Sequence, residues 1–133
     1  MRAHRGFTLI EILVACVVAA LLAAAALPSM RGDALRAARI DAVQALTRLQ
    51  AAQEQYRNAS GGYAGELAAL RGVARLSEQG RYLLTLQPTG TEAYRATATA
   101  RGAQAADTAC AVLTLDVNRG FAQAGPGPQC WNR

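Results

Sequence analysis

One acidic side chain stands in an unusual chemical setting near the start of this sequence. Glu11 follows a basic leader, Met1-Arg2-Ala3-His4-Arg5, and the segment Gly6-Phe7-Thr8-Leu9-Ile10, and an uncharged apolar run from Ile12 to Leu27 comes after it. An ionisable group at the centre of a bilayer costs roughly 2.5–3.5 kcal/mol on insertion scales, so a carboxylate in such a segment indicates function by default. We therefore expect Glu11 to have a cationic partner.

The remaining side chains offer little for catalysis or metal binding. His4 is the single histidine, and it lies in the leader. Asp107 and Asp116 lie on either side of Cys110 in the sequence, but two carboxylates are too few for a calcium site. The sequence has no Cys-x-x-Cys pair, which makes a zinc site improbable. We predict a protein that is not an enzyme, with no catalytic residues, no cofactor and no metal.

A membrane segment must position the Glu11 carboxylate. Residues 7–30 are long enough to span the hydrocarbon core as a helix. A secretory signal cut near Ala24-Ala25-Ala26 is one alternative, and a simple membrane anchor is another. A carboxylate is wrong for an apolar signal core, and neither alternative explains Gly6-Phe7. Pro28 lacks an N–H and clashes with the preceding turn, so we expect a kink or a local unwinding there.

The period of the apolar residues predicts a second helical segment over 31–57. Leu35, Ala42, Leu49 and Tyr56 recur every seven residues, with Ala38, Val43, Leu46 and Gln53 in the adjoining rows. The charged residues Arg36, Asp41, Arg48 and Glu54 are expected mostly off this stripe. The stripe needs a partner surface, and the downstream residues are the natural one.

Residues 58–80 are predicted to connect the helix to a sheet, with a short helix over 66–75. The period then changes to two, and strands are expected over 81–87, 92–100 and 110–117, separated by turns at 88–91 and 118–120. The tail from Gly125 to Trp131 is too rich in proline and glycine for regular structure. Residues 81–133 therefore form the sheet and a C-terminal loop, and 31–133 form one globular domain.

Taken together, the leader charge, Gly6, Phe7, Glu11, the apolar run and Pro28 resemble the N-terminus of type IV prepilins. The resemblance implies that residues 1–6 are a leader removed after Gly6, and that Phe7 is then methylated on its nitrogen. It further implies that Glu11 pairs with the Phe7 amine of a neighbouring subunit during assembly, and that Pro28 is the helix-bending proline of the family. The alternative for Glu11 is that it snorkels to the membrane interface.

The same resemblance implies the pilin fold, an α+β architecture. A long N-terminal helix, with a membrane half and an amphipathic half, packs on an antiparallel sheet of three to four strands. Cys110 and Cys130 lie outside the cytoplasm in this topology, where an oxidising compartment favours a disulfide that closes the C-terminal loop. Cys16, in the apolar run, is expected to be a reduced and buried small hydrophobe.

The function that follows is structural. We interpret the chain as a subunit of a type IV pilus, most similar to the small PilE-like minor pilins, with a major pilin or a type II secretion pseudopilin as alternatives. The expected partners are other pilin subunits, the prepilin peptidase and the inner-membrane assembly machinery. The chain should reside in the bacterial inner membrane as a single-pass protein with a cytoplasmic N-terminus, and then in the extracellular pilus.

A receptor for DNA uptake is the alternative from another class. Some similar pilins bind DNA through basic residues near the disulfide loop, and the candidates here are Arg101, Arg119, Trp131 and Arg133. Phosphate binding usually recruits several cations at once, and a tryptophan beside a cysteine more often fills a small core. Removal of the two leader arginines lowers the formal net charge from +5 to +3, which permits a polyanionic partner without implying one.

Overall fold

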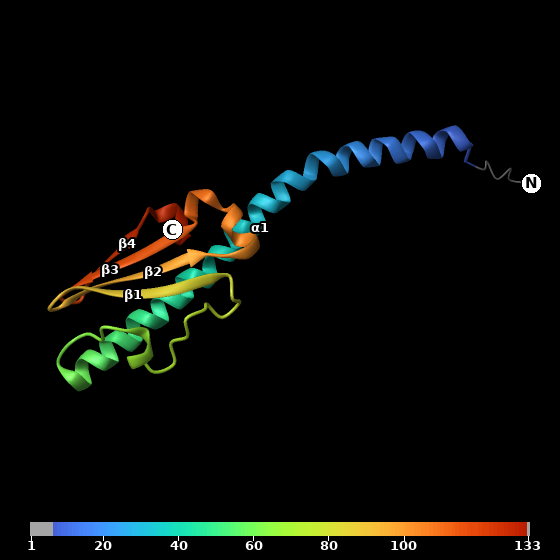
Figure 1. Cartoon of the computed structure of the whole chain (residues 1–133). Helices are drawn as coiled ribbons and strands as arrows, with labels where there is room; N and C mark the ends of the chain where they lie inside the picture. Colours follow the sequence, from blue (N-terminus) through green and yellow to red (C-terminus); the bar gives the residue numbers. More distant parts are fainter. Residues whose placement is uncertain (1–6, 133) are drawn as a thin grey trace, which may run out of the picture. The chain divides into compact units, whose positions relative to one another are not determined.

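The computed structural model describes residues 7–132, which fall into two compact units divided between Ala34 and Leu35. One long helix, α1 (Leu9–Ser60), runs through the first unit and into the second. The second unit adds four strands, β1 (Tyr82–Gly90), β2 (Ala93–Ala100), β3 (Val112–Asn118) and β4 (Phe121–Gly125), as Figure 1 shows. Four short 3₁₀ turns join them, at Leu67–Ala69, Gly102–Ala106, Thr108–Cys110 and Pro128–Trp131. The α+β class predicted from the sequence is confirmed.

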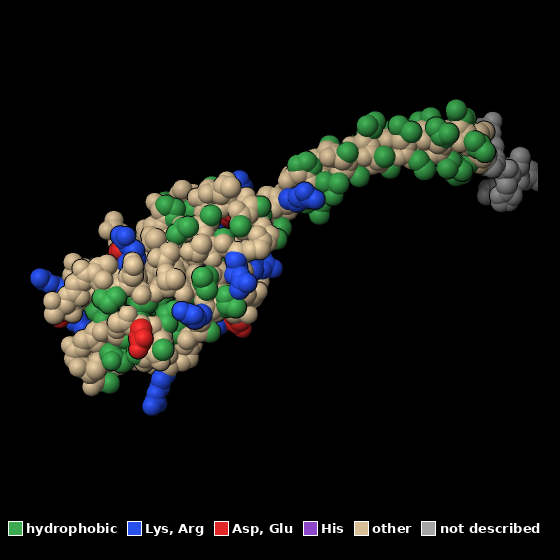
Figure 2. All heavy atoms as spheres, in the orientation of Figure 1, with side chains coloured by type: hydrophobic (Ala, Val, Ile, Leu, Met, Phe, Trp, Pro, Cys, Tyr) green, Lys and Arg blue, Asp and Glu red, His purple; other side chains and the backbone are tan. Residues whose placement is uncertain are grey.

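In the first unit, α1 carries the apolar run on an exposed surface. The carbonyl of Thr8 accepts the first backbone bonds of the helix, from the N–H groups of Glu11 and Ile12. Every described residue up to Ala34 is exposed, and apolar side chains cover the helix in Figure 2. By length and composition this helix can cross a membrane. Because 52 residues form one helix, backbone groups in its interior are satisfied by the helix itself, as a bilayer requires.

The structure bears on two sequence expectations for this segment. Pro28 lies within continuous α-helix, so of the kink or local unwinding expected there, the unwinding is not observed; proline removes one donor, and the bonds on either side keep the helix intact. Next to it, Ser29 Oγ donates to the carbonyl of Ala26 at 2.8 Å. Cys16 is free as expected, but its side chain is exposed rather than buried. The exposed apolar side chains around it can be buried only against lipid or against another chain.

In the second unit, one face of α1 packs on the sheet. The predicted stripe is confirmed, because Ala38, Ala42, Leu46, Leu49 and Gln53 are all buried. They meet the inward-facing side chains of three strands. These are Tyr82 and Leu84 from β1, Tyr94, Ala96 and Ala98 from β2, and Leu113, Leu115 and Val117 from β3. The core thus lies between one helix and one sheet face, and the green half of α1 runs along that face in Figure 1.

The sheet is an antiparallel meander in the order β1-β2-β3-β4. Tyr82 lies opposite Ala100, Tyr94 opposite Val117, and Leu115 opposite Ala124. Because side chains alternate between faces with a period of two, this register brings the apolar set of each strand to the same side. The sequence left open whether there are three strands or four, and there are four.

The outer edge of β1 is largely occupied. The N–H of Tyr82 donates to Ser77 Oγ at 3.0 Å, and the N–H of Leu84 donates to the carbonyl of Arg75 at 2.7 Å. By the alternation of the strand, Leu86 and Pro88 point their backbone nitrogens the same way, and proline has no N–H to offer. Leu86 is therefore the one free donor on this edge between residues 82 and 88.

Several boundaries differ from the sequence expectation. Helix α1 ends at Ser60 rather than at residue 57, and β1 continues through Pro88 to Gly90 before it turns. The helix expected over 66–75 is a single 3₁₀ turn, because the backbone is already extended at Leu70 and Gly72 then has a φ of +72°, which no helix contains. The tail, expected to lack regular structure, contains the short 3₁₀ helix Pro128–Trp131.

Asp41 is a further correction, since it was expected on the solvent side of α1. It is 1% exposed, and its carboxylate accepts from Ser77 Oγ at 2.6 Å and from the N–H of Gln79 at 3.1 Å. Ser77 is itself buried, and its hydroxyl accepts the N–H of Tyr82. This chain of bonds ties the helix to the segment before β1, which explains why a buried carboxylate is tolerated.

Candidate functional site

The first chemical group of interest is the carboxylate of Glu11. Phe7 and Glu11 are four residues apart, and together with Ile12, Ala15, Cys16 and Ala19 they line an open, apolar groove of about 420 Å³ on the helix surface. Within residues 7–132 no cation pairs with this carboxylate. Gly6 lies outside the described residues. The described part of the chain therefore supplies no cationic partner for Glu11.

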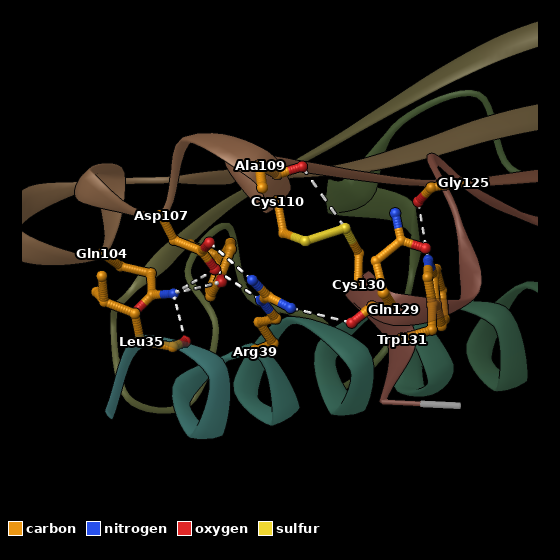
Figure 3. The surroundings of a disulfide bond; sticks show 11 residues. Leu35, Arg39, Gln104, Asp107, Ala109, Cys110, Gly125, Gln129, Cys130 and Trp131 are labelled. Atoms are coloured by element: carbon orange, nitrogen blue, oxygen red, sulfur yellow. Dashed lines mark hydrogen bonds and ion pairs between the residues drawn. A yellow bond between two sulfur atoms is a disulfide. The ribbon is translucent and has the colours of Figure 1, made fainter. Parts of the chain in front are cut away.

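The second group is a buried ion pair that ties α1 to the loops around the disulfide (Figure 3). Arg39 Nε donates to Asp107 Oδ2 at 2.7 Å and one terminal nitrogen donates to Oδ1 at 2.8 Å, a two-pronged contact. The other terminal nitrogen donates to the carbonyl of Gln129 at 3.0 Å. Gln104 adds bonds to the carbonyl of Leu35 and to the hydroxyl of Tyr82, both at 3.0 Å.

The ionisation of this pair follows from its hydrogen bonds. The bonds from Arg39 hold the pKa of the Asp107 carboxyl below its ordinary value, although burial works in the opposite direction. The same bonds raise the pKa of the Arg39 guanidinium. Both side chains are largely buried, with exposures of 10% and 7%. The pair therefore stays charged and acts as a structural tie rather than as an acid or a base in catalysis.

The disulfide predicted from the sequence is present. Cys110 and Cys130 are bonded with their Cα atoms 5.5 Å apart, and both are buried. Trp131, the neighbour of Cys130, is 7% exposed, and its indole N–H donates to the carbonyl of Gly125 at 2.8 Å. The disulfide holds the C-terminal residues against the connection between β2 and β3, which also contains Asp107.

The three candidate DNA contacts that the structure describes, Arg101, Arg119 and Trp131, do not lie together. Arg101 follows β2 at one end of the sheet, whereas Arg119 bonds Glu92 at the other end, about 25 Å away along an eight-residue strand. Trp131 is packed in the core, so its ring is not free to stack on a base. Arg133 lies outside the described residues. The described candidates are thus divided between the two ends of the sheet and the core.

The structure instead separates two kinds of arginine. Five are paired with carboxylates: Arg39 with Asp107, Arg48 with Glu78, Arg57 with Glu54, Arg95 with Asp116 and Arg119 with Glu92. In residues 35–132, five others are exposed and have no described carboxylate within 4.0 Å: Arg36, Arg71, Arg75, Arg81 and Arg101. In Figure 2 the basic side chains outnumber the acidic ones on the visible face of this unit.

Three of these free arginines gather at the start of β1. The N–H of Arg101 donates to the carbonyl of Arg81 at 2.9 Å, and the carbonyl of Arg75 accepts from Leu84, three residues into the strand. We call Arg75, Arg81 and Arg101 the basic edge. One signal for Arg75 is present in the sequence, since no acid occurs between Glu66 and Glu78 while Arg71 and Arg75 do. The approach of Arg101 depends on strand register and could not be anticipated.

Two cavities of more than 400 Å³ lie beside the loop between α1 and β1. One, of about 430 Å³, is lined by Leu84, Thr85 and Leu86 of β1, and Glu66 and Arg75 are also among its lining residues. The other, of about 480 Å³, lies between α1 and the loop and is lined by Ala52, Gln55, Tyr56, Ala59, Ala69 and Arg71. The second has no acidic lining residue, so the two cavities differ in the charge that they offer a ligand.

Comparison with known protein families decides the identity. Residues 28–114, more than half of the chain, match the family described as type IV minor pilin ComP, DNA uptake sequence receptor. The chain belongs to this family of type IV minor pilins. Residues 1–27 match the prokaryotic N-terminal methylation motif. No curated protein matches the chain.

The two matched regions divide this minor pilin near the boundary between its units. The methylation motif contains Gly6, Phe7 and Glu11, and the family region runs from Pro28 through α1, β1 and β2 into β3. The family is structural and assembles with other pilins. The pilin's exposed N-terminal helix fits this, since an apolar helix surface is expected where chains pack against lipid or against one another.

Proposed function

We propose that this minor pilin is a receptor that binds DNA for uptake. The observation that carries the proposal is the basic edge, where Arg75, Arg81 and Arg101 are exposed and free of carboxylates while most other arginines of the same unit are neutralised. The description of the matched family, which names a DNA uptake sequence receptor, supports the same reading.

The physical argument is electrostatic. A paired arginine has already exchanged water for a carboxylate and gains little from a phosphate, whereas a free arginine releases counterions from DNA when it binds. The backbone bond between Arg81 and Arg101 places these two arginines opposite each other, at the start of β1 and just after the end of β2. Adjacent cations of this kind can contact successive phosphates of one strand. Several contacts together give an affinity that one cation cannot.

The test is the salt dependence of DNA binding by the full-length pilin in detergent micelles. Each phosphate contact contributes about −0.9 to the slope of log K against log salt for duplex DNA. The variant Arg81→Gln/Arg101→Gln should bind more weakly, with a slope less steep by about 1.8. The control Arg48→Gln/Arg95→Gln removes the same formal charge from arginines that are already paired. Equal losses of DNA affinity in both variants would show that only the net charge matters, and would reject the basic edge as the site.

We also propose that the pilin is processed and assembled through its N-terminus. In this proposal a prepilin peptidase cuts after Gly6, Phe7 is N-methylated, and the Glu11 carboxylate pairs with the Phe7 amine of a neighbouring subunit. The inner membrane holds the chain before assembly, with the N-terminus in the cytoplasm, and the pilus holds it afterwards. The unpartnered Glu11 carboxylate supports the pairing. Intact-mass measurement with N-terminal fragmentation tests the processing, and a mature chain starting near Ser29 would contradict it.

A further inference from the structure

The cavity between α1 and the loop that follows it has features that the basic edge does not explain. Its helix wall consists of Ala52, Gln55, Tyr56 and Ala59, which are spaced i, i+3, i+4 and i+7 and therefore share one face. The opposite wall is Ala69 and Arg71 from the loop. At about 480 Å³, its volume falls in the range of roughly 300–1,000 Å³ typical of small-ligand sites.

The lining side chains leave room for a flat ring beside Tyr56. Ala52 lies one turn before this tyrosine and Ala59 nearly one turn after it, so the helix presents no bulky neighbour on either side. Tyr56 is half-buried, with part of its surface against the core, and its hydroxyl makes no hydrogen bond to a described residue. The tyrosine is thus held by packing while the cavity side of the residue stays open.

The charge of the cavity is positive. Arg71 is its one charged lining residue, it is exposed, and no described carboxylate lies within 4.0 Å of it. Glu54 is engaged elsewhere, because it accepts from the hydroxyl of Tyr63 at 2.8 Å. Glu66 lines the other cavity. Gly72, which has a φ of +72°, forms the turn directly after Arg71 and fixes where that side chain leaves the loop.

An aromatic ring, a free guanidinium and a side-chain amide in one cavity match the parts of a nucleotide. Bases stack on aromatic side chains in single-stranded DNA sites, where arginine neutralises the phosphate. The Gln55 amide can donate to and accept from the edge of a base. We propose that this cavity takes one unpaired nucleotide of bound DNA, with the base against Tyr56 and its phosphate on Arg71. The inference rests on the proposed DNA-receptor function and deepens it.

The test compares two DNA probes on the full-length pilin in detergent micelles. One is a blunt duplex, and the other is the same duplex with a single-stranded thymidine overhang. Stacking of one base should make the overhang probe bind about 5- to 100-fold more tightly. The variants Tyr56→Ala and Arg71→Gln should lose this preference and keep the affinity for the blunt duplex. Tyr56→Phe, which retains the ring, and Arg48→Gln, which removes a paired arginine, should keep the preference.

The outcomes separate this inference from the function on which it rests. If wild type binds both probes equally, or if Arg71→Gln keeps the overhang preference, the cavity is not a nucleotide site and the DNA-receptor function stands. If wild type binds neither probe, the receptor function fails and the inference fails with it. If Arg71→Gln keeps the overhang preference but reduces incorporation into sheared filaments, the cavity is a contact between subunits and the inference is overturned.

Discussion

The two units of this pilin handle the same kinds of side chain in opposite ways. In the first unit, the apolar residues of α1 are exposed and the carboxylate of Glu11 has no partner within the described chain. In the second unit, the same helix buries its apolar stripe against a sheet, and the carboxylates of Asp41 and Asp107 are buried and hydrogen-bonded. One continuous helix thus serves two different environments.

Each unit obtains its stability from a different source. Residues 35–132 satisfy their buried charges internally, so their free energy of unfolding belongs to the single chain. Residues 7–34 have no such internal partners, so substitutions there should act on insertion and assembly. Substitutions of the same chemical type in the two units can test this division, with the fluorescence of the single, buried Trp131 reporting the unfolding of the second unit.

The largest effect is expected at the buried ion pair. Asp107→Asn leaves Arg39 as a buried charge without its carboxylate, which should lower the free energy of unfolding by about 3–5 kcal/mol. Glu11→Gln, the same type of change in the first unit, should leave that free energy unchanged. Denaturant titration in detergent measures both. A loss below about 1 kcal/mol for Asp107→Asn would contradict the structural role given to the pair.

The same variant gives a pH test. Because the pKa of Asp107 is lowered in the folded state, its carboxylate stabilises the fold above the unfolded pKa of about 3.9, and this contribution is lost as the pH falls through the folded value. The stability difference between wild type and Asp107→Asn should therefore be constant from pH 7 to about pH 5 and shrink below about pH 4. A difference that grows on acidification would have the wrong sign.

The next largest effect is expected from the disulfide. Its two cysteines are 20 residues apart in sequence, and closing a loop of that size stabilises by about 3 kcal/mol in the chain-entropy model. Cys110→Ser/Cys130→Ser should destabilise the second unit by about this amount. Cys16→Ser in the first unit is the matched control, because that thiol is free, and it should leave the unfolding transition unchanged. Equal losses in the free energy of unfolding of the two variants would contradict the division between the two units.

A smaller effect is expected from one hydroxyl in each unit. Ser77→Ala removes a buried donor from the Asp41 carboxylate, which should cost about 1.5–3 kcal/mol. Ser29→Ala removes an exposed hydroxyl that donates to its own helix, and its effect should stay within about 0.5 kcal/mol. The two midpoints are read from the same denaturant titration. A larger loss for Ser29→Ala would show that the first unit contributes to this transition after all.

The smallest effect on folding is expected for Glu11→Ala, although its effect on assembly should be clear. The variant removes a charge from the apolar segment, so membrane insertion should be unchanged or better. Under the proposed pairing with Phe7, the amount of the variant in sheared filaments relative to its amount in membranes should fall. The loss should be partial, because neighbouring subunits keep their own glutamates. A ratio equal to wild type would favour interface snorkelling.

Much of the fold could be predicted because it follows from local periodicity. The seven-residue spacing of Leu35, Ala42 and Leu49 placed the buried stripe of α1, and the alternation in Tyr82-Leu83-Leu84 placed the inner face of β1. The cysteines near the end could be paired because the chain is small and exported in the proposed topology. These features depend on neighbours within a few residues or on composition.

The site depended on contacts that sequence spacing does not contain. Arg39 and Asp107 are 68 residues apart, and Asp41 and Ser77 are 36 apart, so sequence spacing showed neither the ion pair nor the buried bond, and Asp41 was expected off the buried stripe. The candidate DNA contacts were chosen by nearness in sequence to the cysteines, whereas strand register places Arg101 beside Arg81 and far from Arg119. Trp131 was correctly suspected of filling the core, and its burial at 7% bears this out.

The edge of β1 has a consequence for how copies of this pilin can join. With Tyr82 and Leu84 already donating and with proline at position 88, the sheet has a single free donor there, too few for the strand of another subunit to add on. Subunits crowded at an assembly site are thereby kept from polymerising edge to edge at β1. Contact between subunits is then left to other surfaces, among them the exposed helix and β4, the other edge strand of the sheet.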